Sequence, residues 1–280
     1  MKASGSEYDK KIEQLANAII ESVRDSIHAN GKEKTGVMFS GGLDSTALAC
    51  AAKKFCAPIL FTFGTEGCED LETARKVASQ LGLELNEKVL TEKEVFEGAS
   101  EFRKVFGDDL LAVELAFSIS VVCAMARDAG VKTLLNGAGA EELFAGYHRH
   151  VLHFRQGKNL RKLLDEELAS LPKRDIARAE LVSKKFGVKI VCPLMDARVV
   201  SAARAFAPEE NIQISDKGEI AKKIVLRDAA KLFGVPELAR LRPKKAMQYG
   251  SGVHKALMLE RQKFPPGARN PFKGAKQNKD

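Results

Sequence analysis

The sequence predicts an α/β protein with a doubly wound parallel sheet and a mainly helical C-terminal half. Three observations predict this class. Short apolar runs alternate with amphipathic segments of helical length, a glycine turn joins the first apolar run to a helix, and strand patterns fade beyond about residue 147. Such alternation is typical of parallel sheets, because each crossover between parallel strands needs a connection as long as a helix.

Each element follows from its own pattern. Apolar residues recur every three or four positions from Ile12 to Ile27, which predicts an amphipathic helix that ends at Asn30-Gly31. We expect strands at residues 35–39, 58–63, 83–90 and 132–136, and helices that begin near residue 46 or span residues 70–80 and 110–129. Asp196 is expected to cap a helix that starts at Ala197.

The most apolar stretch, residues 110–126, contains Glu114, Ser118 and Ser120 and is shorter than the roughly 18 apolar residues that a membrane span needs. It predicts a buried helix and no membrane association. The N-terminus becomes charged and amphipathic before any apolar segment, so we expect no secretory signal and a cytoplasmic protein.

The charge of the chain is concentrated at its end. Residues 261–280 hold six of the 45 lysines and arginines and one of the 37 acidic residues, whereas the net charge of the whole chain is +8. Because this segment also contains Pro265-Pro266-Gly267, we expect a flexible basic tail. A solvated tail is favoured over a nucleic-acid-binding arm, and we expect no other nucleic-acid contact. The five cysteines form no Cys-x-x-Cys pair, which argues against a disulfide framework and a zinc site.

The glycine turn at residues 40–45 (Ser-Gly-Gly-Leu-Asp-Ser) lies between the first strand and its helix. Glycines let backbone N–H groups approach a phosphate closely, and the positive end of the helix dipole favours an anion there. Asp44 would repel that phosphate unless a divalent cation lay between them, so the turn implies Mg²⁺. The turn lacks the lysine of a Walker motif and the third glycine of a dinucleotide fingerprint.

These six residues resemble the loop of the ATP pyrophosphatase (PP-loop) superfamily, which splits ATP between the α and β phosphates. A narrower resemblance is to the synthetase domain of class B asparagine synthetases. Residues 137–147 (Gly-Ala-Gly-Ala-Glu-Glu-Leu-Phe-Ala-Gly-Tyr) are similar to the family motif Gly-Glu-Gly-Ala-Asp-Glu-Leu-Phe-Gly-Gly-Tyr. Residues 191–196, 223–227 and 242–245 follow in family order, so the resemblance covers about residues 33–257.

The resemblance implies an adenine nucleotide alpha hydrolase-like fold and a set of roles. ATP and Mg²⁺ are the implied cofactors, with Asp44 and Glu141 as metal ligands. Lys244 and Lys223 would neutralise the leaving pyrophosphate, and Glu142 would assist them in catalysis. The implied nucleotide-binding residues are Ser40, Gly41, Gly42, Leu43, Asp44, Ser45, Phe63, Gly64, Gly137 and Gly139.

The resemblance also divides the chain. It implies an N-terminal helix (residues 1–32), a PP-loop ATP-binding core (33–150), a helical part that completes the active site (151–258) and the basic tail (259–280).

Two positions depart from the family pattern. The first glutamate of the second motif, proposed as the base toward the amine, is Ala138 here, and the metal aspartate is replaced by Glu141. The chain begins Met1-Lys2, without the N-terminal cysteine of a glutaminase domain. We therefore expect free ammonia, an amine or a separate amidotransferase subunit to supply the nitrogen.

The leading hypothesis is an enzyme that adenylates a small-molecule carboxylate with release of pyrophosphate and then forms an amide. A second hypothesis is a PP-loop enzyme that activates a nucleobase oxygen for RNA modification. A third is a non-catalytic ATP-binding subunit that lost its base at Ala138. His148, His150 and His153 are expected to be ordinary surface or core residues. Residues 249–252 form either a mobile loop over the substrate or an ordinary connection.

Overall fold

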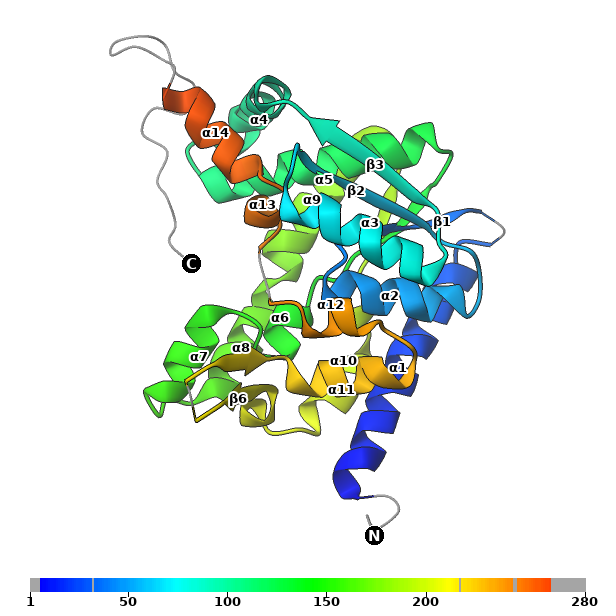
Figure 1. Cartoon of the computed structure of the whole chain (residues 1–280), viewed down its shortest axis with the longest axis vertical. Helices are drawn as coiled ribbons and strands as arrows, with labels where there is room; N and C mark the ends of the chain where they lie inside the picture. The colour runs from blue at the N-terminus through cyan, green and yellow to red at the C-terminus, as the bar shows by residue number, and fades with distance from the viewer. Residues whose placement is uncertain (1–5, 32, 217, 244–245, 263–280) are drawn as a thin grey trace.

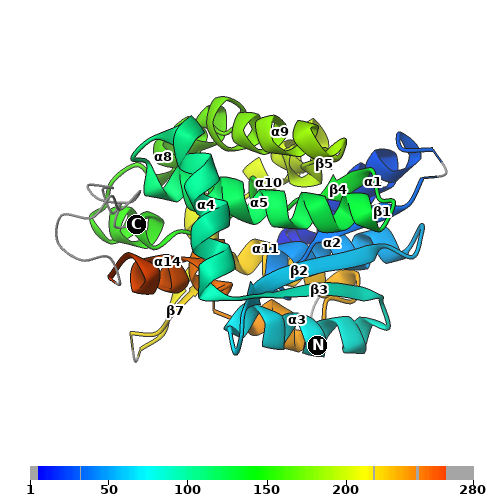
Figure 2. The same ribbon diagram turned by 90° about the horizontal axis from the view of Figure 1, so that it is seen from above.

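A computed structural model describes residues 6–31, 33–216, 218–243 and 246–262 of the chain. Its centre is a five-stranded parallel sheet with the order β3-β2-β1-β4-β5. Figure 1 shows β1, β2 and β3, and Figure 2 also labels β4 and β5. The strands are β1 (Thr35–Met38), β2 (Ile59–Thr65), β3 (Leu85–Leu90), β4 (Thr133–Leu135) and β5 (Lys189–Val191). The order runs outward from β1 in one direction and from β4 in the other, which confirms the predicted doubly wound parallel sheet.

Helices cover both faces of the sheet, as Figure 2 shows with α5 and α9 on one side and α3 on the other. The helices of the first half are α1 (Glu7–His28), α2 (Leu43–Lys53), α3 (Glu69–Leu81), α4 (Glu92–Phe106) and α5 (Leu110–Asp128). Successive residues of the central strands β1, β2 and β4 pack into opposite cores: Leu60 packs with α1, α2 and α3, whereas Phe61 packs with α4 and α5. Burial on both faces explains why these three strands are apolar runs, whereas the outer strand β3 is largely exposed and contains polar residues.

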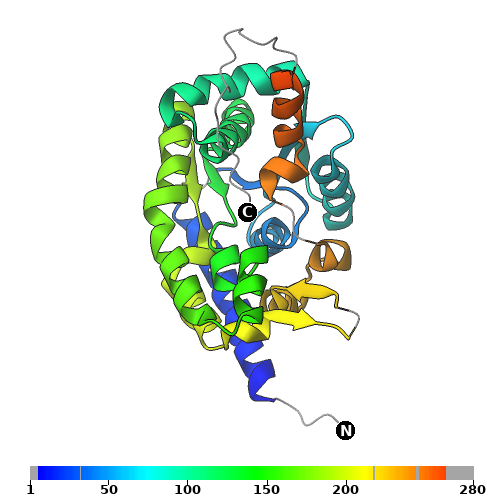
Figure 3. The same ribbon diagram turned by 90° about the vertical axis from the view of Figure 1, so that its left-hand side faces the viewer.

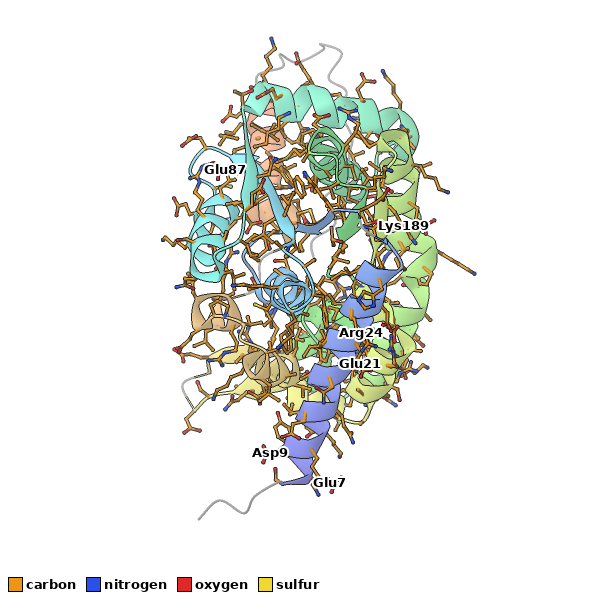
Figure 4. The ribbon with its side chains drawn as sticks, turned by 90° about the vertical axis from the view of Figure 1, so that its right-hand side faces the viewer. Glu7, Asp9, Glu21, Arg24, Glu87 and Lys189 are labelled. Atoms are coloured by element: carbon orange, nitrogen blue, oxygen red, sulfur yellow. The ribbon has the colours of Figure 1, made fainter. Side chains whose placement is uncertain are left out.

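Helix α1 lies on the outside of the molecule. Its apolar stripe, which includes Leu15, Ile19 and Val23, is fully buried. Figure 4 shows Glu21 and Arg24 on its outward side. The predicted amphipathic helix is therefore confirmed.

Helix α5 is long and apolar enough to cross a membrane, but most of its apolar window is buried inside the fold. It passes across one face of the sheet and packs against α4 and α9. The predicted buried helix is thus confirmed. Glu114 within it lies 2.7 Å from His254 Nδ1, and burial raises the pKa of its carboxyl although His254 opposes the shift.

The C-terminal half is mainly helical, as predicted. It contains α6 (Ala140–Leu143), α7 (His148–Arg155), α8 (Leu160–Ser170), α9 (Ala177–Ser183), α10 (Ala197–Arg204), α11 (Ile224–Leu232), α12 (Glu237–Leu241), α13 (Met247–Gly250) and α14 (Val253–Gln262). A single π-helical turn, η1 (Pro172–Ile176), joins α8 to α9, and 3₁₀ turns lie at Lys184–Phe186, Pro193–Met195 and Pro208–Asn211.

The sequence analysis missed three strands and one helix. β5 adds the last strand to the sheet, and β6 (Ile212–Ile214) pairs with β7 (Ile220–Lys222) in an antiparallel hairpin, seen in yellow in Figure 3. Three residues are too few to establish a period of two, and these strands, unlike the equally short β4, lie in the half of the chain whose patterns are mainly helical. Helix α4 was also missed, although Thr91 and Glu94 form a capping box at its start.

Two smaller predictions have different outcomes. Asp196 caps α10 as expected, because its Oδ1 accepts a hydrogen bond of 2.9 Å from the backbone N–H of Arg198. The predicted flexible tail began at residue 259, but α14 continues to Gln262. Residues 263–280 lie outside the described part of the chain.

Candidate active site

The Ser40–Ser45 loop joins the end of β1 to the first turn of α2. Gly41 has a φ of 69°, and a Cβ there would lie 2.9 Å from the backbone nitrogen of Ala74 in α3. Both the left-handed backbone and the close approach require glycine. The loop is therefore folded tightly against α3, and α2 begins at Leu43 with its N-terminus beside it.

The two serines of the loop stabilise its shape. Ser45 Oγ donates to the carbonyl of Gly42 at 3.2 Å and accepts from the backbone N–H of Ser40 at 3.3 Å. Ser40 Oγ accepts from the N–H of Gly42 at 3.4 Å. The hydroxyl groups thus hold the loop in a conformation that is set before any ligand arrives.

The loop after β4 lies beside the first loop. β1 and β4 are adjacent parallel strands at the point where the strand order reverses, so their carboxyl ends open into one crevice. Asn136 Oδ1 accepts from the N–H of Ala138 at 2.8 Å and shapes the turn. A Cβ at Gly137 would lie 3.0 Å from the Asp44 Cβ, so the two glycine turns are in direct contact.

Lys223 connects the two loops. Its Nζ lies 2.8 Å from both carboxylate oxygens of Asp44 and 2.8 Å from Glu141 Oε1. The lysine side chain is 3% exposed, and the two carboxylates are 16% and 10% exposed. One buried ammonium therefore holds together the two acidic residues that the sequence analysis assigned to the metal.

The backbone at Lys223 is strained. Its φ of 57° lies in the left-handed region, which costs a non-glycine residue about 1 to 3 kcal/mol. A Cβ at Gly146 would lie 1.8 Å from Glu141 Oε2 and 2.3 Å from Lys223 Cε, so only glycine fits there. Strain and close packing together fix the lysine on the two carboxylates.

Asp44 and Glu141 fit the chemistry of a Mg²⁺ site. Mg²⁺ is a hard cation that proteins hold through one or two carboxylates together with substrate phosphates. Within the described residues, no group of three or more His, Cys, Asp or Glu residues forms a cage for a metal. Two carboxylates beside the glycine loop would therefore suit a cation that arrives with substrate phosphates.

Two arginines surround this centre, and the sequence analysis gave them no role. Arg242 donates to the Ser40 carbonyl at 3.0 Å and to Asp70 Oδ1 at 2.8 Å, which ties the segment before Lys244 to the glycine loop. Arg227 lines the same cavity, and burial lowers the pKa of its guanidinium. Both arginines lie in the motifs at residues 223–227 and 242–245, so these motifs could have indicated that the arginines belong to the site.

A second polar group lies around Glu142, whose side chain is 2% exposed. Tyr147 Oη donates a hydrogen bond to Glu142 Oε1 at 3.3 Å, and Arg174 Nη2 from turn η1 lies 4.0 Å from the same oxygen. Burial, aided by the charges of Glu141 and Glu167, raises the pKa of Glu142 to about 7. The adjacent residues Glu141 and Glu142 thus face different surroundings.

Glu167 closes this second group. Burial alone would raise its pKa, but hydrogen bonds from His150 and Arg149 outweigh burial and lower the pKa to about 2. His150 Nε2 and Arg149 Nε each lie 2.8 Å from a carboxylate oxygen of Glu167. Fully buried His150 therefore has a structural partner, in agreement with the ordinary role predicted for it.

The two groups line one cavity with a volume of about 660 Å³. Most of the predicted site residues line it: Ser40, Gly42, Leu43, Asp44, Ser45, Phe63, Gly137, Gly139, Glu141, Glu142 and Lys223. Gly41 packs on α3, and Gly64 packs against Cys68 and the Ser251 carbonyl, so neither lines the cavity. Lys244 lies outside the described residues, although Pro243 beside it lines the cavity.

The segment at residues 249–252 contributes a wall to this cavity. Gly250 ends α13, and Ser251 lines the cavity while its carbonyl accepts from the N–H of Thr65 at 2.9 Å. This bond fastens the segment to the end of β2.

Comparison with known proteins identifies relatives of this chain. The family model for asparagine synthase matches residues 14–173. A putative asparagine synthetase of Methanocaldococcus jannaschii is 32% identical over 92% of this chain and 52% of its own length. Asparagine synthetase B of Escherichia coli is 28% identical over 86% of this chain and 45% of its own length. The chain thus spans about half the length of these relatives.

A solved structure, NMN synthetase from Francisella tularensis, covers 91% of this chain and 88% of its own with a TM-score of 0.48 and 14% identity. This likeness carries no conclusion about function. The family match covers more than half of the chain and contains both glycine loops and both carboxylates of the Lys223 cluster. The chain belongs to the asparagine synthase family.

Proposed function

We propose that this chain uses ATP and Mg²⁺ to adenylate a carboxylate with release of pyrophosphate, and that ammonia or an amine then captures the acyl group as an amide. The observation that carries the proposal is the Lys223 cluster. It places Asp44 and Glu141 at the carboxyl ends of adjacent parallel strands, beside a preformed glycine loop at a helix N-terminus.

The first step forms one bond and breaks one. A carboxylate oxygen attacks the α-phosphorus of ATP, the bond from that phosphorus to the oxygen that bridges it to the β-phosphorus breaks, and pyrophosphate leaves. The leaving group concentrates negative charge, which buried cations stabilise most strongly in a site that excludes water. In our proposal, Lys223 and Lys244 supply the positive charge that stabilises the leaving pyrophosphate. Mg²⁺ held by Asp44 and Glu141 would neutralise the phosphates further.

The second step transfers the acyl group from AMP to nitrogen. The nitrogen attacks the acyl carbon, the carbon–oxygen bond to AMP breaks, and the nitrogen loses a proton to solvent or to a nearby base. Ala138 cannot accept that proton. We propose that Glu142, held by Tyr147 on the cavity wall, positions the reacting groups in this half of the site.

The nucleotide lies across the two loops in this proposal. Ser40 to Ser45 hold the phosphates through the backbone and hydroxyl groups, Gly137 and Gly139 border them, and the backbone at Phe63 and Gly64 faces the adenine. We further propose a cytoplasmic enzyme that takes its nitrogen from free ammonia, an amine or a separate amidotransferase subunit.

Acceptor-dependent release of pyrophosphate tests the function. The purified chain is incubated with ATP, Mg²⁺, ammonium or hydroxylamine, and a panel of carboxylic acids, while pyrophosphate is measured by a coupled enzyme assay. Release that requires an acid and is lost in Asp44→Ala supports the proposal. Binding of ATP without turnover across the panel would contradict it and favour a non-catalytic subunit. Glu72→Ala on the outer side of α3 is the matched control.

A further inference from the structure

One wall of the cavity is apolar. Leu111, Leu115, Ile119 and Val122 recur on α5 at steps of four, four and three, which places them on one face of the helix, and all four line the cavity. An adjoining wall is formed by Leu171, Ile176 and Ala179, from the end of α8 through η1 to α9, which packs against α5. Figure 2 shows α5 and α9 on the same side of the sheet.

The exposed surface of these side chains faces the cavity. Leu111 and Leu115 are only half-buried, whereas their neighbours Ala112, Val113 and Ala116 on the same helix are buried in the core. Because the two leucines line the cavity, their remaining exposed surface faces it. Apolar surface held inside a concave site is the usual means of binding the apolar part of a ligand.

The charged residues near this wall do not offer a subsite for a second charge. Arg149 pairs with Glu167 at 2.8 Å, and Asp175 pairs with Arg178 at 2.8 Å and with Arg174 at 2.7 Å. Each of these three arginines thus has an acidic partner from the same chain, Glu167 or Asp175. This half of the cavity selects a ligand by its apolar surface.

This step rests on the proposed function, in which three reactants share the cavity: ATP, ammonia and the acid. ATP takes the polar side around the glycine loop and Lys223, and ammonia needs no pocket of its own. The acid must bring its carboxylate to the α-phosphate and lay the rest of its body against another wall. We therefore infer that the acid activated by this enzyme carries an apolar alkyl or aryl group that packs against the α5 face at Leu111, Leu115 and Ile119 and the adjoining η1–α9 wall.

A chain-length series tests this inference on binding alone. The full chain is loaded with Mg²⁺ and α,β-methylene-ATP, which cannot release pyrophosphate, and titrated calorimetrically with propanoate, pentanoate, heptanoate, succinate and aspartate. We expect the affinity to rise about fourfold per added methylene group until the wall is covered. Pentanoate and heptanoate should bind more tightly than succinate and aspartate, whose extra charged groups meet the apolar α5 face and arginines that already have acidic partners.

Two substitutions test whether the chain-length dependence of the affinity comes from the α5 face and the η1–α9 wall. Leu115→Asn should reduce the gain per methylene to less than twofold while α,β-methylene-ATP binds as in the wild type. Ala179→Phe, which adds a ring at the adjoining η1–α9 wall, should weaken heptanoate at least tenfold and propanoate little. Leu181→Asn is the matched control, because this leucine is 47% exposed on α9 and does not line the cavity.

The inference is overturned if affinity is independent of chain length, if aspartate or succinate binds more tightly than heptanoate, or if no acid binds to the nucleotide-loaded protein. A chain-length dependence that Leu115→Asn leaves intact would also overturn it. Pyrophosphate release from ATP with the same acids separates this result from the proposed function. Apolar acids that bind without turnover refute the function alone, and turnover of aspartate without a chain-length effect refutes the inference alone.

Discussion

Removing the ammonium of Lys223 gives the most direct test of the site. In Lys223→Met, the side chain keeps its approximate length, but three contacts of 2.8 Å from Nζ to the oxygens of Asp44 and Glu141 are lost. All three side chains are less than one-fifth exposed, so water replaces the lost contacts poorly. Breaking a buried ion pair by removing one partner costs about 3 to 5 kcal/mol.

The assay is urea denaturation at pH 7 in the presence of EDTA. With an m-value of about 3 kcal/mol per molar urea, the expected loss lowers the midpoint by about 1 to 1.7 M. Lys231→Met is the control, because Lys231 is exposed near the end of α11, and a surface substitution of this kind changes stability by about 0.5 kcal/mol or less.

Adding Mg²⁺ sharpens the test. In Lys223→Met, the two carboxylates lose the ammonium of Lys223, so Mg²⁺ should raise the urea midpoint of the variant more than that of the wild type. A midpoint within 0.2 M of the wild type in EDTA would show that the lysine does not hold the two loops together. An equal response of both proteins to Mg²⁺ would show that Asp44 and Glu141 do not share a metal position. Pyrophosphate release should fall at least about a hundredfold in the variant, as for other groups that stabilise developing charge.

Four further outcomes are expected. Asp44→Ala should abolish magnesium-dependent pyrophosphate release in the coupled assay, and an unchanged rate would remove Asp44 from the metal site. Lys244→Ala should lower kcat more than the affinity for ATP, whereas equal losses would indicate ground-state binding only. Ala138→Glu should change turnover less than about twofold, and a large gain would identify a decayed asparagine synthetase. Because the pKa of Glu167 is lowered from 4.5 to about 2 in the folded protein, its contribution to stability is full above about pH 4.5 and is lost as the pH falls toward 2. Urea midpoints measured from pH 5 to pH 2.5 should fall less in Glu167→Gln than in the wild type, and identical slopes would disprove the pairing of Glu167.

The sequence predicted the parts of the fold whose signal is local. The stripe on α1, the buried α5 and the turn between β1 and α2 each depend on residues that are close in the chain, and the structure confirms them. β5 could not be predicted in this way, because it has three residues and is a strand only through its pairing with β4.

The sequence indicated which residues belong to the candidate site better than how these residues contact one another. The motifs brought Asp44, Glu141 and Lys223 to attention, but not that one ammonium bridges both carboxylates. Arg242 was inside a quoted motif, yet its bond to the Ser40 carbonyl spans 202 positions. Contacts between such distant residues depend on the packing of the two halves, which no local pattern records.

The large sequence separation between the site residues also determines when the site can form during translation. Lys223 meets Asp44 across 179 positions, and Arg242 reaches the glycine loop later still. A nascent chain that has exposed only its parallel-strand core carries the loop, Asp44 and Glu141 without Lys223 and Arg242. The proposed nucleotide site is therefore complete only when translation is nearly finished, and a chain that stops upstream of the β6–β7 hairpin lacks the ammonium that bridges the two acids.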